Sequence, residues 1–312
     1  MGKIEASRHN VRDIIGTRAW QSIRFVRTKG AGAVYSRLTG AVMRALLVML
    51  VIATPTVLLI DRHPDVQQMV ALVALFAGAL AFVEYNAVYP GLVEFRDAPP
   101  FNRIRFLMLF ATVFCLSVIE RGRFQPSTMT ELVHAVGALI GISMDFPYSP
   151  VRLATLMMAN DATDAQIGAV RTAAGMSYLI SLVSLGIFAI QLRVGTWPRR
   201  DKAFNVWVNL PTFDPTSGGD VVVRLKRDAR VNIALGFLLP FLIPAVVEIA
   251  SEGFQPLELT SPQTLIWTMT AWAFLPASLF MRGIAMGRVA DMISARRKYD
   301  GASATAGHYA PV

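Results

Sequence analysis

Residues 193–230 read RVGTWPRRDKAFNVWVNLPTFDPTSGGDVVVRLKRDAR, and this stretch decides the fold. It carries eight basic side chains against four acidic ones. On either side lies an apolar segment long enough to cross a bilayer, residues 173–192 and 231–249. A basic connector between two spanning helices stays in the cytoplasm, because lysine and arginine resist translocation. The connector therefore predicts the sidedness of the whole chain.

The composition agrees with a membrane protein. Of the 312 residues, 54% are hydrophobic and only 16% are charged, and the mean hydropathy is +0.47. The net charge of +9 is also typical of nucleic-acid binding, but a basic cytoplasmic face gives the same total, so we expect no nucleic-acid partner. The single cysteine, Cys115, lies in an apolar segment, so we expect neither a disulfide nor a cysteine-based metal or haem site.

We predict an all-α integral membrane protein with six transmembrane helices and both termini in the cytoplasm. The expected spans are residues 42–60, 66–89, 104–119, 173–192, 231–249 and 263–281. This topology places every lysine inside, and the arginines left outside are Arg62, Arg121, Arg123, Arg152 and Arg171. A seventh span at residues 132–144 would instead put a basic face outside.

Basic segments flank this six-helix domain, residues 42–282, at both ends of the chain. Residues 1–41 contain an amphipathic pattern near residues 10–27, which predicts a helix lying on an anionic inner leaflet. A solvated basic tail explains the same residues equally well. Residues 283–312 form a second basic cytoplasmic tail.

The outer segment, residues 120–172, holds apolar helices too short to span comfortably. Thr128-Met-Thr-Glu131 has the form of a capping box and opens a helix at residues 132–144. Ser149 and Pro150 suit the N-cap and first position of a second helix at residues 151–159. We therefore expect a re-entrant or surface-lying helical pair within residues 129–160. Asp161 or Thr163 is expected to cap the helix that runs into the fourth span.

Small residues and prolines mark where helices should touch or bend. Gly137 and Gly141 are one turn apart, as are Ser177 and Ser181, a spacing that permits close helix contact. Pro240 and Pro244 predict a kink in the fifth span.

The ionisable side chain nearest to mid-membrane is Glu84, in the sequence Glu84-Tyr85-Asn86 of the second span. Ionisable side chains inside a membrane are usual markers of transport or catalysis. Glu84 is placed to bind a cation or to pair with Arg96 or Arg103, and it is equally consistent with an interfacial carboxylate in an aromatic belt.

A second polar group, His134, Asp145 and Arg152, would converge outside if the two short helices fold back on each other. One histidine and one carboxylate make neither a metal site nor a nucleophile-and-base pair. We therefore predict no catalytic residue, cofactor or metal.

Within the connector, alternating apolar residues predict a small cytoplasmic β-hairpin, with strands at residues 204–210 and 220–225. An isolated two-stranded ribbon is marginal in water, so the hairpin needs cover from this chain or from a partner. The expected docking residues are Phe204, Val206, Trp207, Val208, Val221 and Val223.

These features favour a non-enzymatic accessory, scaffold or assembly subunit of a membrane complex, paired with another membrane protein or with a second copy of itself. A small-solute or ion transporter or channel is the alternative, based on the paired prolines, the re-entrant segment and Glu84. The high alanine content and the excess of arginine over lysine are typical of a GC-rich bacterium, which predicts a multi-pass protein of the bacterial inner membrane.

Overall fold

The computed structural model describes residues 35, 37–59, 64–96, 98–158, 161–195, 197, 209–214, 216, 218–253 and 259–307. Within these ranges every regular element is a helix. Six helices there are long and apolar enough to cross a membrane, which confirms the predicted class of helical membrane protein. They are Arg37–Leu58, α2 (Pro64–Asn86), α3 (Pro99–Gly122), α6 (Asp164–Val194), α8 (Val221–Gly253) and α9 (Pro262–Gly307).

Several helices continue beyond the apolar segments that predicted them. The apolar segment at residues 173–192 lies within the 31-residue α6, and the one at residues 263–281 lies within the 46-residue α9. Hydropathy detects only the part of a helix that suits lipid, whereas a polar extension stays helical when it is capped or packed. The start of α6 is capped by Thr163, whose hydroxyl accepts from the backbone N–H of Gln166.

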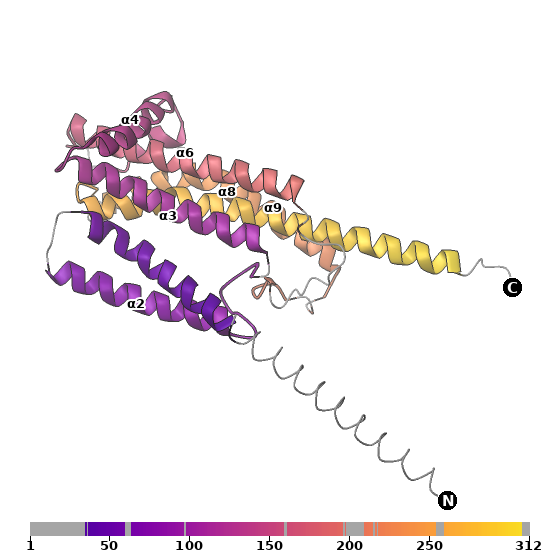
Figure 1. Ribbon diagram of the computed structural model, residues 1–312. Coiled ribbons are helices and arrows are strands. Elements are labelled where there is room, and N and C mark those ends of the chain that lie inside the picture. The colour runs from indigo at the N-terminus through magenta and orange to yellow at the C-terminus, as the bar shows by residue number, and fades with distance from the viewer. Residues whose placement is uncertain are drawn as a thin grey trace, which may run out of the picture.

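The helices form a bundle with a helical hairpin at its side (Figure 1). Helices α3, α6 and α9 contact one another, and α8 packs along α9. Helix Arg37–Leu58 and α2 form the hairpin, with helix Arg37–Leu58 between α2 and α3 in Figure 1. The start of helix Arg37–Leu58 and the end of α9 lie at the same end of the molecule, here named the terminal end. The opposite end, here named the α4 end, carries α4 (Thr128–Ser143) and α5 (Pro150–Thr155).

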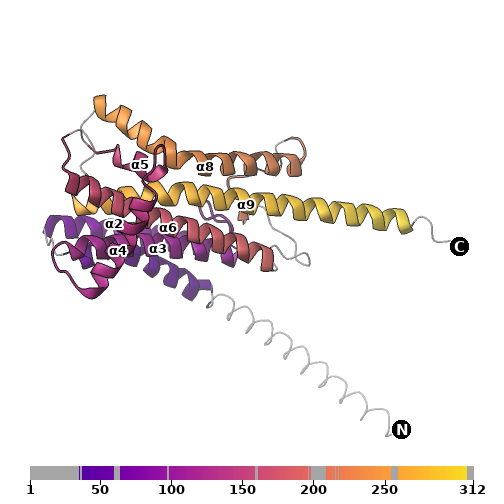
Figure 2. The ribbon, with the colours of Figure 1, turned by 90° about the horizontal axis from the view of Figure 1, so that it is seen from above.

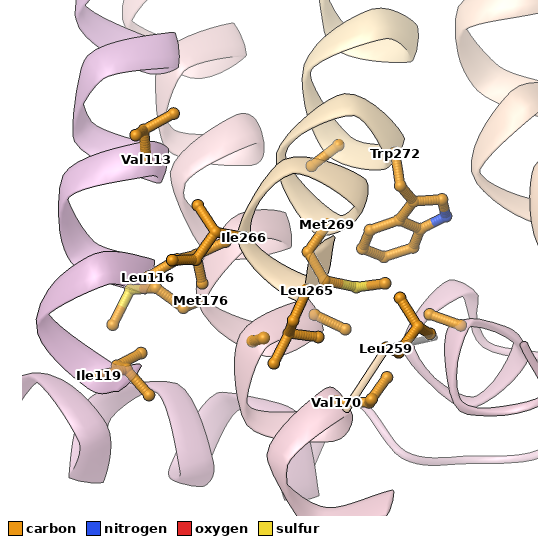
Figure 3. Packing of buried hydrophobic residues seen from close by; sticks show 14 of the residues in the cluster. Val113, Leu116, Ile119, Val170, Met176, Leu259, Leu265, Ile266, Met269 and Trp272 are labelled. Atoms are coloured by element: carbon orange, nitrogen blue, oxygen red, sulfur yellow. The ribbon is translucent and has the colours of Figure 1, made fainter. Parts of the chain in front are cut away.

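Two apolar cores follow one another along the bundle. The core toward the α4 end joins α3, α6 and α9, and Figure 3 shows Ile266, Met269 and Trp272 of α9 among its side chains. The core toward the terminal end includes Phe95, Phe101 and Leu225, all of them almost fully buried. Phe95 belongs to the loop between α2 and α3, so this second core also packs the chain tightly where its spans end.

The α2 helix is the least enclosed of the long helices. Gly78 faces Met49 of helix Arg37–Leu58 so closely that an added Cβ would lie 2.7 Å from the Met49 Cγ. Its other faces expose large apolar side chains, including Met69, Leu72 and Phe76. Exposed apolar side chains of this size require cover that the described part of the chain does not supply.

The short helices at the α4 end begin close to the predicted positions. The capping box of α4 consists of Ser127 and Thr130, one residue earlier than predicted, because the Ser127 hydroxyl accepts from the Thr130 backbone. The predicted cap of α5 is confirmed, since the Ser149 hydroxyl accepts from the Arg152 backbone and Pro150 follows in the first turn. The second helix is shorter than expected and ends at Thr155.

Small residues do bring α4 against α6, as their spacing predicts. A Cβ on Gly175 of α6 would lie 2.6 Å from the Gly141 Cα and 2.7 Å from the Gly137 carbonyl oxygen, so the two backbones touch. Ser177 is fully buried on α6, and its hydroxyl donates to the Ala173 carbonyl.

Proline and tryptophan meet where α8 and α9 cross. Pro244 has no N–H, so the Pro240 carbonyl, one turn earlier in α8, loses its helical donor. The indole N–H of Trp272 in α9 donates to that carbonyl at 3.0 Å. Figure 2 shows α8 turning away from α9 toward the α4 end, the bend that the two prolines predict.

The predicted β-hairpin is wrong in its second strand. Val221 and Val223 lie in the first turn of α8, and no strand occurs in the described part of the chain. The valines favour a strand locally, but Asp220 caps the helix by accepting from the Val222 N–H at 2.9 Å. Val222, Leu225 and Ala229 then share one helical face and are buried, so packing overrides the propensity. Phe204, Val206, Trp207 and Val208 lie outside the described residues.

Candidate functional site: an ion-pair network at the terminal end

Arg282 of α9 and Glu94, in the loop between α2 and α3, form a paired ion bridge. Arg282 donates from Nε to Glu94 Oε2 at 2.6 Å and from Nη2 to Glu94 Oε1 at 2.8 Å. Both side chains are mostly buried, with exposed fractions of 24% for Arg282 and 11% for Glu94. A two-pronged arginine–carboxylate pair fixes both partners in orientation as well as in distance.

Two further side chains complete the network. Arg282 Nη1 donates to the Asn232 side-chain oxygen of α8 at 2.9 Å, and the Thr212 hydroxyl donates to Glu94 Oε1 at 2.8 Å. Asn232 is itself buried and donates to the Asp228 carbonyl at 2.7 Å. The network therefore ties the loop before α3, the loop before α8, and helices α8 and α9 together.

The loop that presents Glu94 is held in an unusual conformation. Phe95 has a φ of 51°, in the region that favours glycine, and its ring is fully buried. Its N–H donates to the Asn209 carbonyl at 2.7 Å, and the Asn102 side chain donates to the carbonyls of Glu94 and Phe95. Burial and three hydrogen bonds thus hold Glu94 toward Arg282.

Glu84 anchors the first part of the same loop. Its Oε2 atom accepts from the backbone N–H groups of Gly91, Leu92 and Val93 at 3.0, 2.8 and 3.2 Å. The carboxylate therefore caps a turn. Arg96, which the sequence offers as an ion-pair partner of Glu84, donates to the carbonyls of Ala87 and Val88.

The neighbours of Glu84 have separate environments. Tyr85 lies beneath the guanidinium of Arg44, whose Cζ atom is 4.6 Å from the ring centroid. Asn86 is exposed at the end of α2.

At the α4 end, two of the three predicted residues meet. Asp145 accepts from Arg152 Nε at 2.7 Å, and it also pairs with Arg171 of α6 at 2.7 Å. His134 lies on an exposed part of α4 and has no part in these ion pairs. Asp145, with an exposed fraction of 12%, thus fastens the loop after α4 to α5 and α6.

Beyond the network, α8 and α9 continue side by side, and residues 221–230 of α8 with residues 285–299 of α9 are here named the projecting pair. Lys226 pairs with Asp291 at 2.9 Å, and Arg297 pairs with Asp220 at 2.7 Å. The hydrogen bonds from Arg297 and from the Val222 backbone hold the pKa of the Asp220 carboxyl below its ordinary value. Leu225, Val289 and Ala290 are buried between the two helices and the adjoining loop.

The central network residues were not predicted as a site. Glu94 belongs to a conspicuously charged connector, but its partner lies far away in sequence, at the end of the sixth span. Arg282 carries one signal, since it is the first charged residue after the apolar segment at residues 263–281. For Asn232 and Thr212 the sequence offers no comparable signal.

Comparison with protein-family models, with curated proteins and with solved structures finds no match for the chain. Within the described ranges, no group of three or more histidine, cysteine or carboxylate side chains is placed to hold a metal ion. What the network does chemically is to neutralise a carboxylate and a guanidinium against each other while joining four segments.

Proposed function

We propose that the chain is a non-enzymatic accessory, scaffold or assembly subunit of a membrane complex in a bacterial inner membrane. Both termini, and with them the terminal end, face the cytoplasm. The observation that carries this proposal is the projecting pair. The 46 residues of α9 correspond to about 69 Å of helix, whereas the hydrocarbon core of a bilayer is about 30 Å thick. A large part of α9 therefore stands outside the membrane. Residues 221–230, at the start of α8, lie beside residues 285–299 of this part.

The projecting pair is suited to docking because it is rigid inside and varied outside. Its inner face is closed by Leu225 and Val289, and its ion pairs join the two helices. Its outer face offers Val223, with an exposed fraction of 62%, beside the exposed Arg227 and Arg230. One apolar side chain among cations is compatible with a partner surface that is partly apolar and partly acidic.

The interior of the spans supports a structural role. The buried hydroxyls of Thr112, Ser117 and Ser177 each donate to a carbonyl one turn earlier in their own helix, at 2.7–2.8 Å. Glu84, the carboxylate that a cation-coupled transporter would need, already accepts three backbone hydrogen bonds. These groups stabilise the fold with partners that are permanently present.

We further propose that α4 lies at the surface of the inner membrane that faces away from the cytoplasm. Its face away from α6 exposes Met129, Leu132, Leu139 and Ile142. An apolar face of this kind on a short helix fits the boundary between headgroups and acyl chains. The contact of Gly122, at the end of α3, with Thr130 in the first turn of α4 places α4 near the level where α3 ends.

The proposal is tested by purifying the chain in a mild detergent and identifying what remains bound. We expect a stable heteromeric partner with the unmodified chain. Val223→Asp combined with Arg227→Glu alters only the outer face of the projecting pair, so the partner should be lost while the six-span protein stays folded.

Phe124→Asp is the matched control, since Phe124 is also 62% exposed but lies at the α4 end. It should keep the partner. A chain that purifies alone or as a symmetric homo-oligomer would contradict the scaffold proposal and favour a small-solute or ion transporter or channel. Retention of the partner by the double variant would place docking elsewhere.

A further inference from the structure

Three arginines from separate segments lie near Tyr85, where the spans end at the terminal end. Arg44 belongs to helix Arg37–Leu58, Arg96 to the loop after α2, and Arg105 to the second turn of α3. The Arg44 guanidinium lies over the Tyr85 ring, with its Cζ atom 4.6 Å from the centroid, and Arg96 donates to the Ala87 carbonyl two residues further along. The charge of Arg105 also acts on Tyr85. The cluster therefore brings positive charges of the helical hairpin and of the main bundle close together. These charges repel one another unless an anion lies among them.

Arg105 has the geometry of a binding group whose acceptor is missing. Its guanidinium lies over the rings of Phe101 and Phe274, with the Cζ atom 5.1 and 5.8 Å from the two centroids. Aromatic contacts occupy the faces of a guanidinium and leave the N–H groups at its edge for an acceptor. The Nε atom is buried, and no described residue accepts its hydrogen. A buried donor without an acceptor is costly, so a ligand that supplies one is strongly favoured.

The nearest carboxylates are already engaged. Glu94 acts on Arg105 through its charge, but both of its oxygens accept from Arg282. Glu84 accepts from backbone N–H groups, which are neutral, so its charge remains, but it offsets only one of the three arginines. Arg44 and Arg96 donate to the neutral carbonyls of Gly40 and Ala87, which satisfy hydrogen bonds without cancelling charge. The cluster thus keeps an excess of positive charge.

We propose that Arg44, Arg96 and Arg105 bind the phosphate of an anionic phospholipid headgroup, with its acyl chains lying along the helices that carry the site. The height of the cluster supports a lipid over a free phosphate. Tyr85 is in the last turn of α2, and Arg105 is near the start of α3, so the cluster lies where two apolar spans meet the headgroup layer. Basic pockets between spanning helices at this level suit anionic headgroups. This site is independent of any docking by the projecting pair.

The test measures lipid binding to the full chain, purified in detergent and exchanged into phosphatidylcholine. Phosphatidylglycerol is then titrated while thermal unfolding is followed. We expect a saturable rise in the unfolding temperature with the unmodified chain. In Arg105→Gln the midpoint concentration of phosphatidylglycerol should rise about tenfold, the effect of losing one charge-assisted hydrogen bond. Arg44→Gln should raise it as well and serves as the second variant if Arg105→Gln does not fold.

Arg103→Gln is the matched control, because it removes the same charge from an exposed position two residues away on α3. It should leave the midpoint unchanged. An equal response of Arg103→Gln and Arg105→Gln would mean that the lipid is attracted by general surface charge, and the assigned site would be wrong. Inorganic phosphate is the other arm, and stabilisation by phosphate as strong as by the lipid would contradict the assignment to a headgroup.

Discussion

Arg282 is at the centre of the ion-pair network at the terminal end. It meets Glu94, Asn232 and Thr212 within hydrogen-bonding distance, and these partners come from three different parts of the chain. A mostly buried ion pair costs much solvation free energy to form, and removing one partner leaves the other charge uncompensated. Its role is therefore best measured as a coupling between the two charges.

We predict that Glu94→Gln and Arg282→Gln each lower the free energy of unfolding by about 2–4 kcal/mol. The double variant should be less destabilised than the sum of the two, with a coupling of at least about 1.5 kcal/mol. A double-mutant cycle in detergent, followed by tryptophan fluorescence, measures this. The exposed pair Lys226 and Asp291 is the control and should couple by under about 1 kcal/mol. Additive losses at Glu94 and Arg282 would show that the pair does not hold the loop.

The sequence predicts residues whose partners are near in the chain better than residues whose partners are distant. Ser149 and Thr163 act as helix caps because capping is decided within four residues. Asp145 and Arg152 meet because only a short turn separates them. The third partner, Arg171, and the pair of Glu94 and Arg282 depend on how helices pack, which local patterns do not encode.

At the level of helices, the closest contacts are made by glycines. Gly137 and Gly141 were recognisable from their spacing, while their partner Gly175 precedes the serines expected to form the contact. The second strand of the hairpin was predicted wrongly because local propensity was given too much weight. Residues 221–223 are three consecutive valines, and a propensity for strands is weak evidence when the following residues carry a helical apolar face.

We predict that Gly175→Ala destabilises the protein by about 1–3 kcal/mol, because the new methyl group would press on the α4 backbone. Gly168→Ala on the same helix is the control, since nothing lies within 4 Å of the added atom. It should be neutral or stabilising by up to about 1 kcal/mol. Thermal unfolding of both variants measures the difference. Equal stability would mean that α4 is not in close contact with α6.

The hydrogen bond between Trp272 and the Pro240 carbonyl gives a second prediction for helix packing. Trp272→Phe should cost at least about 0.5–1.5 kcal/mol through the lost bond, besides the smaller ring. In a Pro244→Ala background the backbone N–H of residue 244 can bond to that carbonyl, so the same substitution should cost less. Unfolding of the four proteins of the cycle tests this, and an unchanged cost would argue against the proposed role of the carbonyl.

For the whole molecule, composition and charge predict the architecture more fully than they predict the function. Six apolar segments correspond to six long helices because the bilayer sets both length and hydropathy. The extensions of α8 and α9 were not predicted, since basic residues there look like a loop until the two helices are seen to pair. The proposed orientation follows from the same basic residues and supports both the docking surface and the headgroup site.

Thiol labelling tests that orientation most directly. In a Cys115→Ala background, cysteines replace Gln125 and Asp161 at the α4 end, and Gly218 and Ala295 at the terminal end. All four positions are exposed, and none is a helix cap. Cells are opened only at the outer membrane and treated with an impermeant thiol reagent. We expect labelling at residues 125 and 161, and labelling at residues 218 and 295 only after lysis. Labelling of residues 218 and 295 before lysis, with residues 125 and 161 protected, would contradict the orientation and the cytoplasmic role built on it.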